Sequence, residues 1–393
     1  MPPSRNTTVC SWDCNWQTTN NSLPRRPSLQ HPLKNILVLN PGSTSTKIAV
    51  YHDNECRWSL TVRHTLDELA PFARIIDQFE YRKQCIVEAL QQNHIPLNFD
   101  AIMARGGLLK PIPGGVYEVN DVMLNDIVHA MRTHACNLGC LIAHELAVSI
   151  PHCRAFIADP GVVDELEPIA RLTGYPRIPR IAMWHALNQR AVAHRYAAEL
   201  TAQHPEQPTA YADLDLIVCH LGGGISVGIH RHGRAVDVPN ALDGTGPFSP
   251  ERAGTLPAGQ LIDLCFSGQV TKEELKRCLT GQGGLVAHLG TNDVRVIEQR
   301  IREGDKHAEL VLNAMIYQVA KEIGAGAAVL FGRVDAILIT GGMAYSEYII
   351  SRLRERIAFI GPIHIYPGED EMEALAFNVL EALNGRQEIR VYQ

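Results

Sequence analysis

The sequence predicts an α/β protein made of two duplicated domains with an active-site cleft between them. Its 393 residues exceed what a single hydrophobic core usually supports, so two domains are expected. A short pattern also recurs: Asn40–Thr46 and His220–Ser226 each place glycine at the third position and a hydroxyl residue at the seventh, about 180 residues apart. Strand patterns followed by helical patterns in both halves favour α/β domains, and ligands commonly bind between such domains.

The first half opens with a hairpin. An apolar run at Asn35–Leu39 and a strand-like run at Ile48–Tyr51 flank the polar segment Asn40–Thr46, which we expect to form the turn between two strands. Apolar residues then recur at helical spacing over Pro71–Asn93 and Val122–Ser149, so both segments are predicted helices.

The second half repeats this order. Runs at Leu216–Cys219 and Val227–Ile229 flank the second turn, and Ala235–Val238 follows as a third strand. Another strand, Ala336–Ile339, ends in a glycine turn before a helix that begins near Ser346. Further helices are predicted at Leu187–Gln203, Pro257–Phe266, Lys272–Thr280, Val294–Glu303, Ala308–Phe331 and Glu371–Leu383.

These elements indicate the domain boundaries. Residues 1–34 are rich in Asn, Thr, Ser and Pro and contain no apolar stretch of the kind found in a secretory signal, so they are predicted to be a disordered tail. Residues 35–186 together with 370–393 are expected to form an N-terminal domain, and residues 187–369 a C-terminal, nucleotide-binding domain.

Composition argues against several classes of protein. With a net charge of −6 and dispersed Lys and Arg, the chain is not expected to bind nucleic acid or an anionic membrane. No run approaches the roughly 20 apolar residues of a membrane span. The 10 cysteines have irregular spacings and several lie inside apolar runs, which indicates reduced thiols and a cytoplasmic protein.

Three glycine-containing turns have the chemistry of a phosphate site. Phosphate oxygens need converging backbone amides that no side chain obstructs, plus hydroxyl or amide donors. Each turn alone is more often a polar hairpin loop, but two matched turns and a third favour nucleotide binding. The candidate residues are Asn40, Gly42, Ser43, Thr44 and Ser45, then His220, Gly222, Gly223 and Gly224, and finally Gly341 and Gly342. The P-loop, dinucleotide-binding and protein-kinase motifs are absent.

Ordered stretches along most of the chain resemble one enzyme family. They are Leu39–Tyr51, Ala104–Asn120, Asn137–Ala147, Phe156–Leu166, His185–Ala191, His220–Val227, Asn240–Gly254, Thr340–Glu347 and Pro367–Ala376. In these stretches the chain resembles the butyrate kinases, within the acetate kinase family of short-chain carboxylate kinases. The resemblance implies two actin-like (ribonuclease H-like) ATPase domains, as in the actin, sugar kinase and Hsp70 superfamily.

The resemblance also implies an activity. It is the ATP-dependent, reversible phosphorylation of butyrate, or of a related short straight or branched carboxylate, to the acyl phosphate. Because acyl phosphates are strong phosphoryl donors, the reverse reaction would make ATP at the end of an acid-forming fermentation. The implied cofactors are ATP or ADP and Mg2+, and the implied assembly is a homo-oligomer, at least a dimer.

The same resemblance assigns roles to four residues. A carboxylate is ionised at pH 7, so it attacks a γ-phosphate without a general base but needs alignment and positive charge. By resemblance, Arg105 would hold the acyl carboxylate or its phosphate, Arg252 the transferring phosphoryl group, and His185 would donate a hydrogen bond to that group. Asp159 would position an active-site group or the metal. The structural alternatives are surface or capping arginines, a core histidine and an Asp-Pro turn.

Metal binding is assigned in the same way. Glu371 resembles the family's Mg2+-associated glutamate, and Asn40 is a candidate for metal and phosphate contacts. The alternative for Glu371 is an acidic residue favoured at a helix N-terminus. Cys136 stands where acetate kinases carry a histidine, so that phosphate-orienting contact is not carried over; His134 lies two residues earlier. Thr245 stands where glutamate is expected.

Three other functions were weighed. A sugar or amino-sugar kinase of the same superfamily would need a carboxylate base for the hydroxyl, for which Asp159 is the candidate. An Hsp70-like, ATP-switched binding module would need an additional substrate-binding domain. A non-catalytic scaffold would not need Arg105, His185, Arg252 and Glu371 together. The length of the acyl chain is not predicted, because two methylenes change binding by only about 1–3 kcal/mol.

Overall fold

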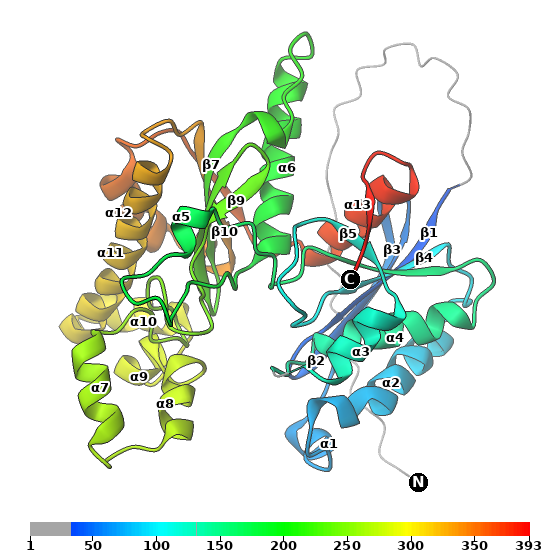
Figure 1. The fold of residues 1–393 in the computed structure, drawn as a ribbon, viewed down its shortest axis with the longest axis horizontal. Helices are drawn as coiled ribbons and strands as arrows, with labels where there is room; N and C mark the ends of the chain where they lie inside the picture. The colour runs from blue at the N-terminus through cyan, green and yellow to red at the C-terminus, as the bar shows by residue number, and fades with distance from the viewer. Residues whose placement is uncertain (1–32, 131) are drawn as a thin grey trace. The chain divides into compact units, whose positions relative to one another are not determined.

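The computed structural model describes residues 33–130 and 132–393, which form two compact α/β units. The first unit contains the chain up to Gly107, Val116–Ala158 and Leu375–Gln393, and the second contains Leu108–Gly115 and Asp159–Ala374. Figure 1 shows a sheet with helices in each unit. The predicted tail lies almost entirely outside the described residues. The predicted domain boundaries and the cleft between domains remain predictions, since a unit defined by contacts is not necessarily a separately folding domain.

The first unit is built on a seven-stranded sheet in the order β12-β5-β6-β4-β1-β2-β3. Strands β1, β2 and β3 form an antiparallel meander, and β4 pairs parallel to β1 on its other side. All five residues of Ile36–Asn40 in β1 are buried, as expected for a central strand covered on both faces. The strands are β1 Asn35–Pro41, β2 Ser45–His52, β3 Glu55–Arg63, β4 Ala101–Arg105, β5 Val116–Glu118, β6 Arg154–Ala158 and β12 Ile389–Val391.

The helices of this unit correct two predictions. The helix predicted over Pro71–Asn93 begins only at Phe79, after a short 3-10 helix. The segment Val122–Ser149 is not one helix but two, α3 (Asp121–Val128) and α4 (Asn137–Val148). Between them the His134 ring accepts a hydrogen bond from the Cys136 backbone amide at 3.2 Å. Such side-chain bonds compete with helical backbone bonds, which accounts for the interruption. The other helices are α1 Leu66–Leu69, η1 Ile75–Gln78 and α2 Phe79–Gln92.

The second unit is built on a five-stranded sheet in the order β11-β10-β7-β8-β9. The strands are β7 Asp215–Leu221, β8 Ile225–Arg231, β9 Arg234–Asp237, β10 Ala336–Gly341 and β11 Ile363–Pro367. Alternate residues of β7 enter different cores: Ile217 and Cys219 pack with α11, whereas Leu216 and Val218 pack with α6. Helices therefore cover both faces of this sheet, which requires the continuous apolar strands seen in the sequence.

The helices of the second unit follow the predicted pattern closely. Among the residues described they are α5 Pro168–Arg171, α6 Ala186–Gln203, η2 Tyr211–Asp213, α7 Ala258–Phe266, α8 Lys272–Leu279, α9 Gly284–Leu289, α10 Val294–Arg302, α11 Lys306–Val329, η3 Gly342–Tyr345 and α12 Glu347–Ile357. The last helix, α13 (Glu371–Leu383), passes from the second unit into the first at Leu375.

The two sheets confirm the predicted duplication. Each contains a meander whose first strand is flanked by a parallel strand, in the order β4-β1-β2-β3 in one unit and β10-β7-β8-β9 in the other. The two matched turns join equivalent strands, β1 to β2 and β7 to β8. Both turns thus lie at the carboxyl ends of central parallel strands, where α/β sheets commonly bind ligands.

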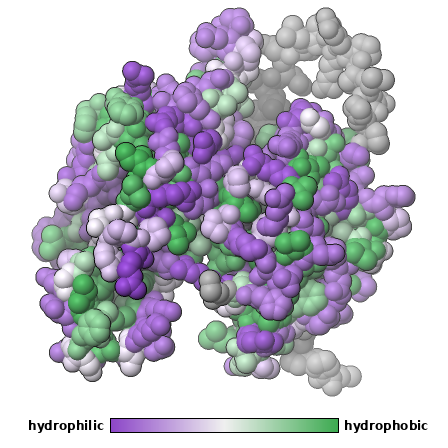
Figure 2. Space-filling model, in the orientation of Figure 1, coloured by the Kyte–Doolittle hydropathy of each residue, from purple (hydrophilic) through white to green (hydrophobic). Residues whose placement is uncertain are grey.

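The surface gives no sign of a membrane span. None of the helices in the described part of the chain is long and apolar enough to cross a bilayer. On the face shown in Figure 2, hydrophilic residues prevail and apolar residues lie in small, separate groups.

Candidate active site

The first turn lies between β1 and β2 and is closed by its own backbone. The Gly42 amide donates to the Ser45 carbonyl oxygen at 2.7 Å. Asn40, at the end of β1, is buried, whereas Ser43 and Thr44 are exposed. The turn therefore presents two hydroxyl side chains and its backbone to a ligand, as the sequence analysis expects of a phosphate site.

A buried arginine from α2 holds this turn from behind. The guanidinium of Arg82, which is 0% exposed, donates to the carbonyl oxygens of Gly42 at 2.8 Å, Ser43 at 2.9 Å and Ser45 at 3.2 Å. It also donates to the Thr46 hydroxyl at 3.2 Å. Burial lowers the pKa of Arg82, but an arginine keeps its charge in proteins. A rigid fork bonded to three carbonyls of one turn leaves the turn little freedom to change shape.

Asn40 and Arg105 lie at the same edge of the first sheet. Leu39 of β1 pairs with Ala104 of β4 in a parallel register, so the next residues of both strands, Asn40 and Arg105, emerge at neighbouring positions. The first sheet thus gathers the first turn, Asn40 and Arg105 at its carboxyl edge.

His134 also reaches the first turn, which the sequence did not predict. Its Nε2 lies 3.3 Å from the Ser43 hydroxyl, and its Nδ1 lies 3.1 Å from the Cys136 sulfur. The imidazole of His134 therefore contacts the first turn. His134 belongs to the segment in which Cys136 stands where acetate kinases carry a histidine.

The second turn has no room for a side chain at Gly222 or Gly224. A Cβ on Gly222 would lie 2.7 Å from Nε2 of His220 and 2.9 Å from Oε1 of Glu369. A Cβ on Gly224 would lie 2.4 Å from Cζ of Arg252. A side chain at either position would therefore displace charged and polar groups that pack directly against the turn's backbone, which favours glycine there.

Arg252 is held against this turn in a partly buried position. Its Nη1 donates to the Ala241 carbonyl oxygen at 3.2 Å. Burial lowers the pKa of Arg252, and Glu251 opposes that shift, so the guanidinium stays cationic. The loop that carries it is fastened to the turn, because the Ser249 hydroxyl donates to the Gly223 carbonyl oxygen at 2.7 Å.

Two histidines stack beside the second turn. The rings of His185 and His220 are 3.9 Å apart between centroids and inclined by 16°. His185 Nδ1 lies 2.8 Å from the Ser226 hydroxyl. His220 Nδ1 lies 2.7 Å from Oδ1 of Asn188, and its Nε2 lies 3.2 Å from Oε1 of Glu369. Both rings are therefore fixed in position by partners on α6, β8 and the segment before α13.

The third turn lies beside the second because β10 pairs with β7 in the sheet. Gly341, at the end of β10, has a φ of +94°, and a Cβ there would lie 2.3 Å from the Leu221 carbonyl oxygen. Gly341 and Gly368 exchange backbone hydrogen bonds of 3.0 and 3.1 Å. The end of β7, the third turn and the acidic segment that follows Gly368 consequently lie together, and Gly342 is exposed.

Glu371 lies at the start of α13, 7% exposed. Within the described part of the chain there is no group of three or more His, Cys, Asp or Glu residues that could hold a metal ion. Mg2+ in kinases is typically held by one or two carboxylates together with substrate phosphates. A single buried glutamate following a second acidic residue, Glu369, fits that kind of site.

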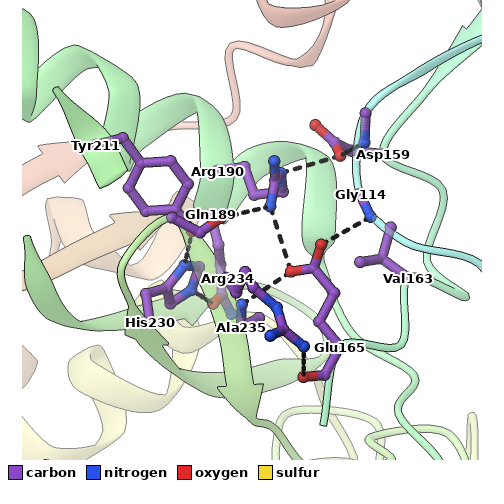
Figure 3. Close-up of polar contacts among 12 residues, drawn as sticks. Gly114, Asp159, Val163, Glu165, Gln189, Arg190, Tyr211, His230, Arg234 and Ala235 are labelled. Atoms are coloured by element: carbon purple, nitrogen blue, oxygen red, sulfur yellow. Dashed lines mark hydrogen bonds and ion pairs between the residues drawn. The ribbon is translucent and has the colours of Figure 1, made fainter. Parts of the chain in front are cut away.

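Asp159 lies in a buried ion-pair network (Figure 3). Its carboxylate, 4% exposed, lies 3.0 Å from Nε of Arg190 and accepts the Gly115 amide at 2.7 Å. Arg190 also contacts Glu165, at 3.5 Å. Burial raises the pKa of Asp159, and Arg190 opposes this by favouring the ionised form. Asp159 is thus bound by Arg190 and by the Gly115 amide. Its role in positioning an active-site group or the metal remains a prediction.

The chain is similar in sequence to proteins of known family. The model of the acetokinase family matches residues 189–365. A protein of Bacteroides thetaiotaomicron named probable butyrate kinase is 62% identical over 358 residues, which is 91% of this chain and 99% of that protein. The chain belongs to the acetokinase family. A protein of the same name from Phocaeicola vulgatus is 53% identical over 358 residues, again 91% of this chain and 99% of its own.

Solved structures of acetokinases have the same fold. An acetate kinase from Porphyromonas gingivalis superposes with a TM-score of 0.71 at 18% identity, covering 88% of this chain and 99% of its own. A propionate kinase from Francisella tularensis gives a TM-score of 0.67 at 19% identity over 88% and 99%. The predicted actin-like fold class is confirmed. Membership of the acetokinase family also implies that ATP is used.

The predicted site residues of this acetokinase fall into two groups. The first unit holds Asn40, the first turn and Arg105. The second holds His185, the second turn with Arg252, the third turn, Asp159 and Glu371. Four further residues at these turns were not predicted: Arg82, Asn188, Ser226 and Glu369. Three of them had a signal, since Ser226 matches Thr46 in the repeat, Glu369 lies in the acidic run of Glu371, and Asn188 lies in the stretch His185–Ala191 that resembles the family. Arg82 had none beyond a helical pattern.

Proposed function

We propose that this acetokinase is a butyrate kinase. It transfers the γ-phosphoryl group of ATP to the carboxylate of butyrate, or of a related short straight or branched acid, and releases ADP and the acyl phosphate. The observation that carries the proposal is the 62% identity, over nearly the whole chain, to a protein named probable butyrate kinase. The second unit supports it with a glycine turn against which Arg252 packs, and with His185 stacked on His220 of the same turn.

The acceptor carboxylate needs no base. It is ionised at neutral pH, so the site must supply alignment and positive charge for the transferring phosphoryl oxygens. Arg252 suits this task because its guanidinium is held against Gly224 and stays charged. Asp159 is less suited to the base that a sugar kinase would need, since its Oδ1 is bound to Arg190 and Gly115.

Two further residues complete the proposed phosphoryl transfer. His185 would donate a hydrogen bond to the transferring group, and its ring is already fixed by Ser226 and by stacking on His220. Arg105, at the carboxyl edge of the first sheet, would hold the acyl carboxylate or its phosphate. The reaction runs in both directions, since the acyl phosphate is itself a strong phosphoryl donor.

The three turns and Glu371 are the proposed binding residues for ATP and Mg2+. The nucleotide phosphates would bind the first turn with Asn40, the second turn with His220, and Gly341 with Gly342. Glu371 and Asn40 would hold Mg2+, which neutralises phosphate charge when it is bound. We further propose that the enzyme is cytoplasmic and forms a homo-oligomer, at least a dimer.

Trapping the acyl phosphate as its hydroxamate tests the activity. The assay contains ATP, Mg2+ and one acid of a series from acetate to valerate, with sugars and amino sugars in parallel. We expect turnover with butyrate or a close relative and none with sugars. Turnover of a sugar and of no acid would refute the proposal.

A further inference from the structure

A chain of buried polar side chains ends at His185. Figure 3 shows its first members, Tyr211, His230 and Gln189. The Tyr211 hydroxyl lies 2.6 Å from Nδ1 of His230, and Nε2 of His230 lies 3.0 Å from Oε1 of Gln189. Gln189 contacts the Ser226 hydroxyl at 2.9 Å, and that hydroxyl lies 2.8 Å from Nδ1 of His185.

The direction of these hydrogen bonds follows from one backbone oxygen. The Ser226 carbonyl oxygen can only accept, and it lies 3.0 Å from Nε2 of Gln189, so the amide nitrogen of Gln189 must face it. Oε1 of Gln189 then faces His230, whose Nε2 must carry the hydrogen. Nδ1 of His230 is left as an acceptor for the Tyr211 hydroxyl.

The charge states agree with this direction. Burial lowers the pKa of His230 to about 3, helped by Arg190 and His194, so the ring is neutral and carries one hydrogen. Burial raises the pKa of Tyr211, so its hydroxyl keeps the hydrogen that it donates. Each group between Tyr211 and Gln189 consequently has one arrangement that satisfies these hydrogen-bond partners.

The same direction continues to His185. The Ser226 hydroxyl accepts a hydrogen bond from Gln189, and its own hydrogen is then donated to Nδ1 of His185. A neutral imidazole whose Nδ1 accepts carries its hydrogen on Nε2. This series of hydrogen bonds thus favours the tautomer in which Nε2 of His185 is a donor.

We propose that Tyr211, His230, Gln189 and Ser226 are positioning residues that keep His185 in the Nε2–H tautomer for donation to the transferring phosphoryl group. The catalytic part of this inference rests on the proposed function, whereas the tautomer itself does not. The stacking of His185 on His220 adds a restraint on the ring plane.

Gly228 leaves space for this series of hydrogen-bonded side chains. A Cβ on Gly228 of β8 would lie 2.2 Å from Oε1 of Gln189 and 2.8 Å from Nε2 of His230. A change at Gly228 can therefore displace the Gln189 amide without removing any polar group. The first unit has Thr46 at the position of Ser226, with its hydroxyl 2.9 Å from Nε2 of His64, so a threonine hydroxyl contacts a histidine ring at the equivalent position.

The first test measures the tautomer directly. The protein is labelled with 15N at histidine, and long-range 1H–15N correlation identifies which ring nitrogen carries the hydrogen; the His185 signals are those absent in His185→Ala. We expect the hydrogen on Nε2 of His185 in the wild-type protein. Hydrogen on Nδ1 would overturn the proposal, whatever the enzyme's activity.

The second test separates positioning from packing. Ser226→Ala and Gly228→Ala should lower kcat by about 10-fold with KM values within about threefold of wild type, less than the roughly 100- to 1000-fold expected when a transition-state donor is removed altogether. Ser226→Thr should restore kcat. The matched control is Ser149→Ala, which removes an exposed hydroxyl bonded to the Leu146 carbonyl and should leave kcat unchanged.

The outcomes are distinguishable. Unchanged kcat in Ser226→Ala, or equal losses in Ser226→Ala and Ser226→Thr, contradicts a positioning role. If Ser226→Ala does not fold, Gly228→Ala and the wild-type tautomer decide. If the wild-type enzyme phosphorylates no carboxylate, the proposed function fails, while the tautomer measurement still stands or falls on its own.

Discussion

Replacing Gly224 with alanine tests whether Arg252 acts where the structure places it. The added Cβ would lie 2.4 Å from both Cζ and Nη1 of Arg252, so the guanidinium must retreat by about 1 Å to reach an ordinary contact. The clash involves the end of a flexible side chain, so the cost in folding free energy should be small. A displacement of about 1 Å of a group that aligns the reaction costs about 100-fold in rate.

The assay is the hydroxamate reaction with ATP, Mg2+ and butyrate, with thermal unfolding measured on the same samples. We expect Gly224→Ala to lower kcat about 100-fold, equivalent to about 2.7 kcal/mol in the activation free energy, with the melting temperature nearly unchanged. Gly324→Ala is the matched control. It lies inside α11, where a Cβ meets nothing within 4 Å, so activity should persist and stability should rise slightly. A kcat within about threefold of wild type in Gly224→Ala would refute the reasoning.

Three further predictions concern charged and titrating groups. Arg252→Ala should nearly abolish turnover and leave the protein folded by circular dichroism; near-normal activity would remove Arg252 from the site. Arg82→Lys should raise KM for ATP and lower the free energy of unfolding in urea by about 2–4 kcal/mol, because an ammonium cannot satisfy three carbonyls of the first turn in a fork; Arg74→Lys, at an exposed ion pair, is its control. The folded-state pKa of His230 is depressed from 6.5 to about 3, so the unfolded state binds the extra proton and stability is lost as pH falls from about 6.5 toward 3. His230→Asn should remove about one proton from the pH slope of the unfolding free energy, and an unchanged slope would contradict the assignment.

The duplicated turns were predictable because each is a local feature. Two apolar runs around a polar, glycine-containing segment specify a hairpin without reference to the rest of the chain. The parallel strands β4 and β6 were not predicted, since a buried run of about five residues has no periodicity that distinguishes it from a helix. In the segment between α3 and α4, His134 contacts Ser43, 91 residues away in the sequence, and only the folded structure brings these two residues together.

The site residues also divide into those that the sequence predicts and those that it does not. The glycines and Arg252 could be proposed from their chemistry and from the family resemblance, because the reaction demands such groups. Arg82 could not, since an arginine in a helical pattern is usually exposed and this one becomes buried only when α2 packs beneath the first turn. The repeat marked Ser226 as a hydroxyl position but gave no partner for it, because its contacts with Gln189 and His185 form only in the folded structure.

The duplication does not make the two turns equivalent. The first turn is satisfied from behind by Arg82 and presents the exposed hydroxyls of Ser43 and Thr44. A Cβ at Gly42 would meet nothing closer than 3.5 Å, so the protein itself has room for a side chain there. Around Gly222 and Gly224 the protein has no such room. The second turn therefore needs glycine because Arg252, His220 and Glu369 pack on it, whereas a requirement for glycine at position 42 would have to come from the bound phosphate.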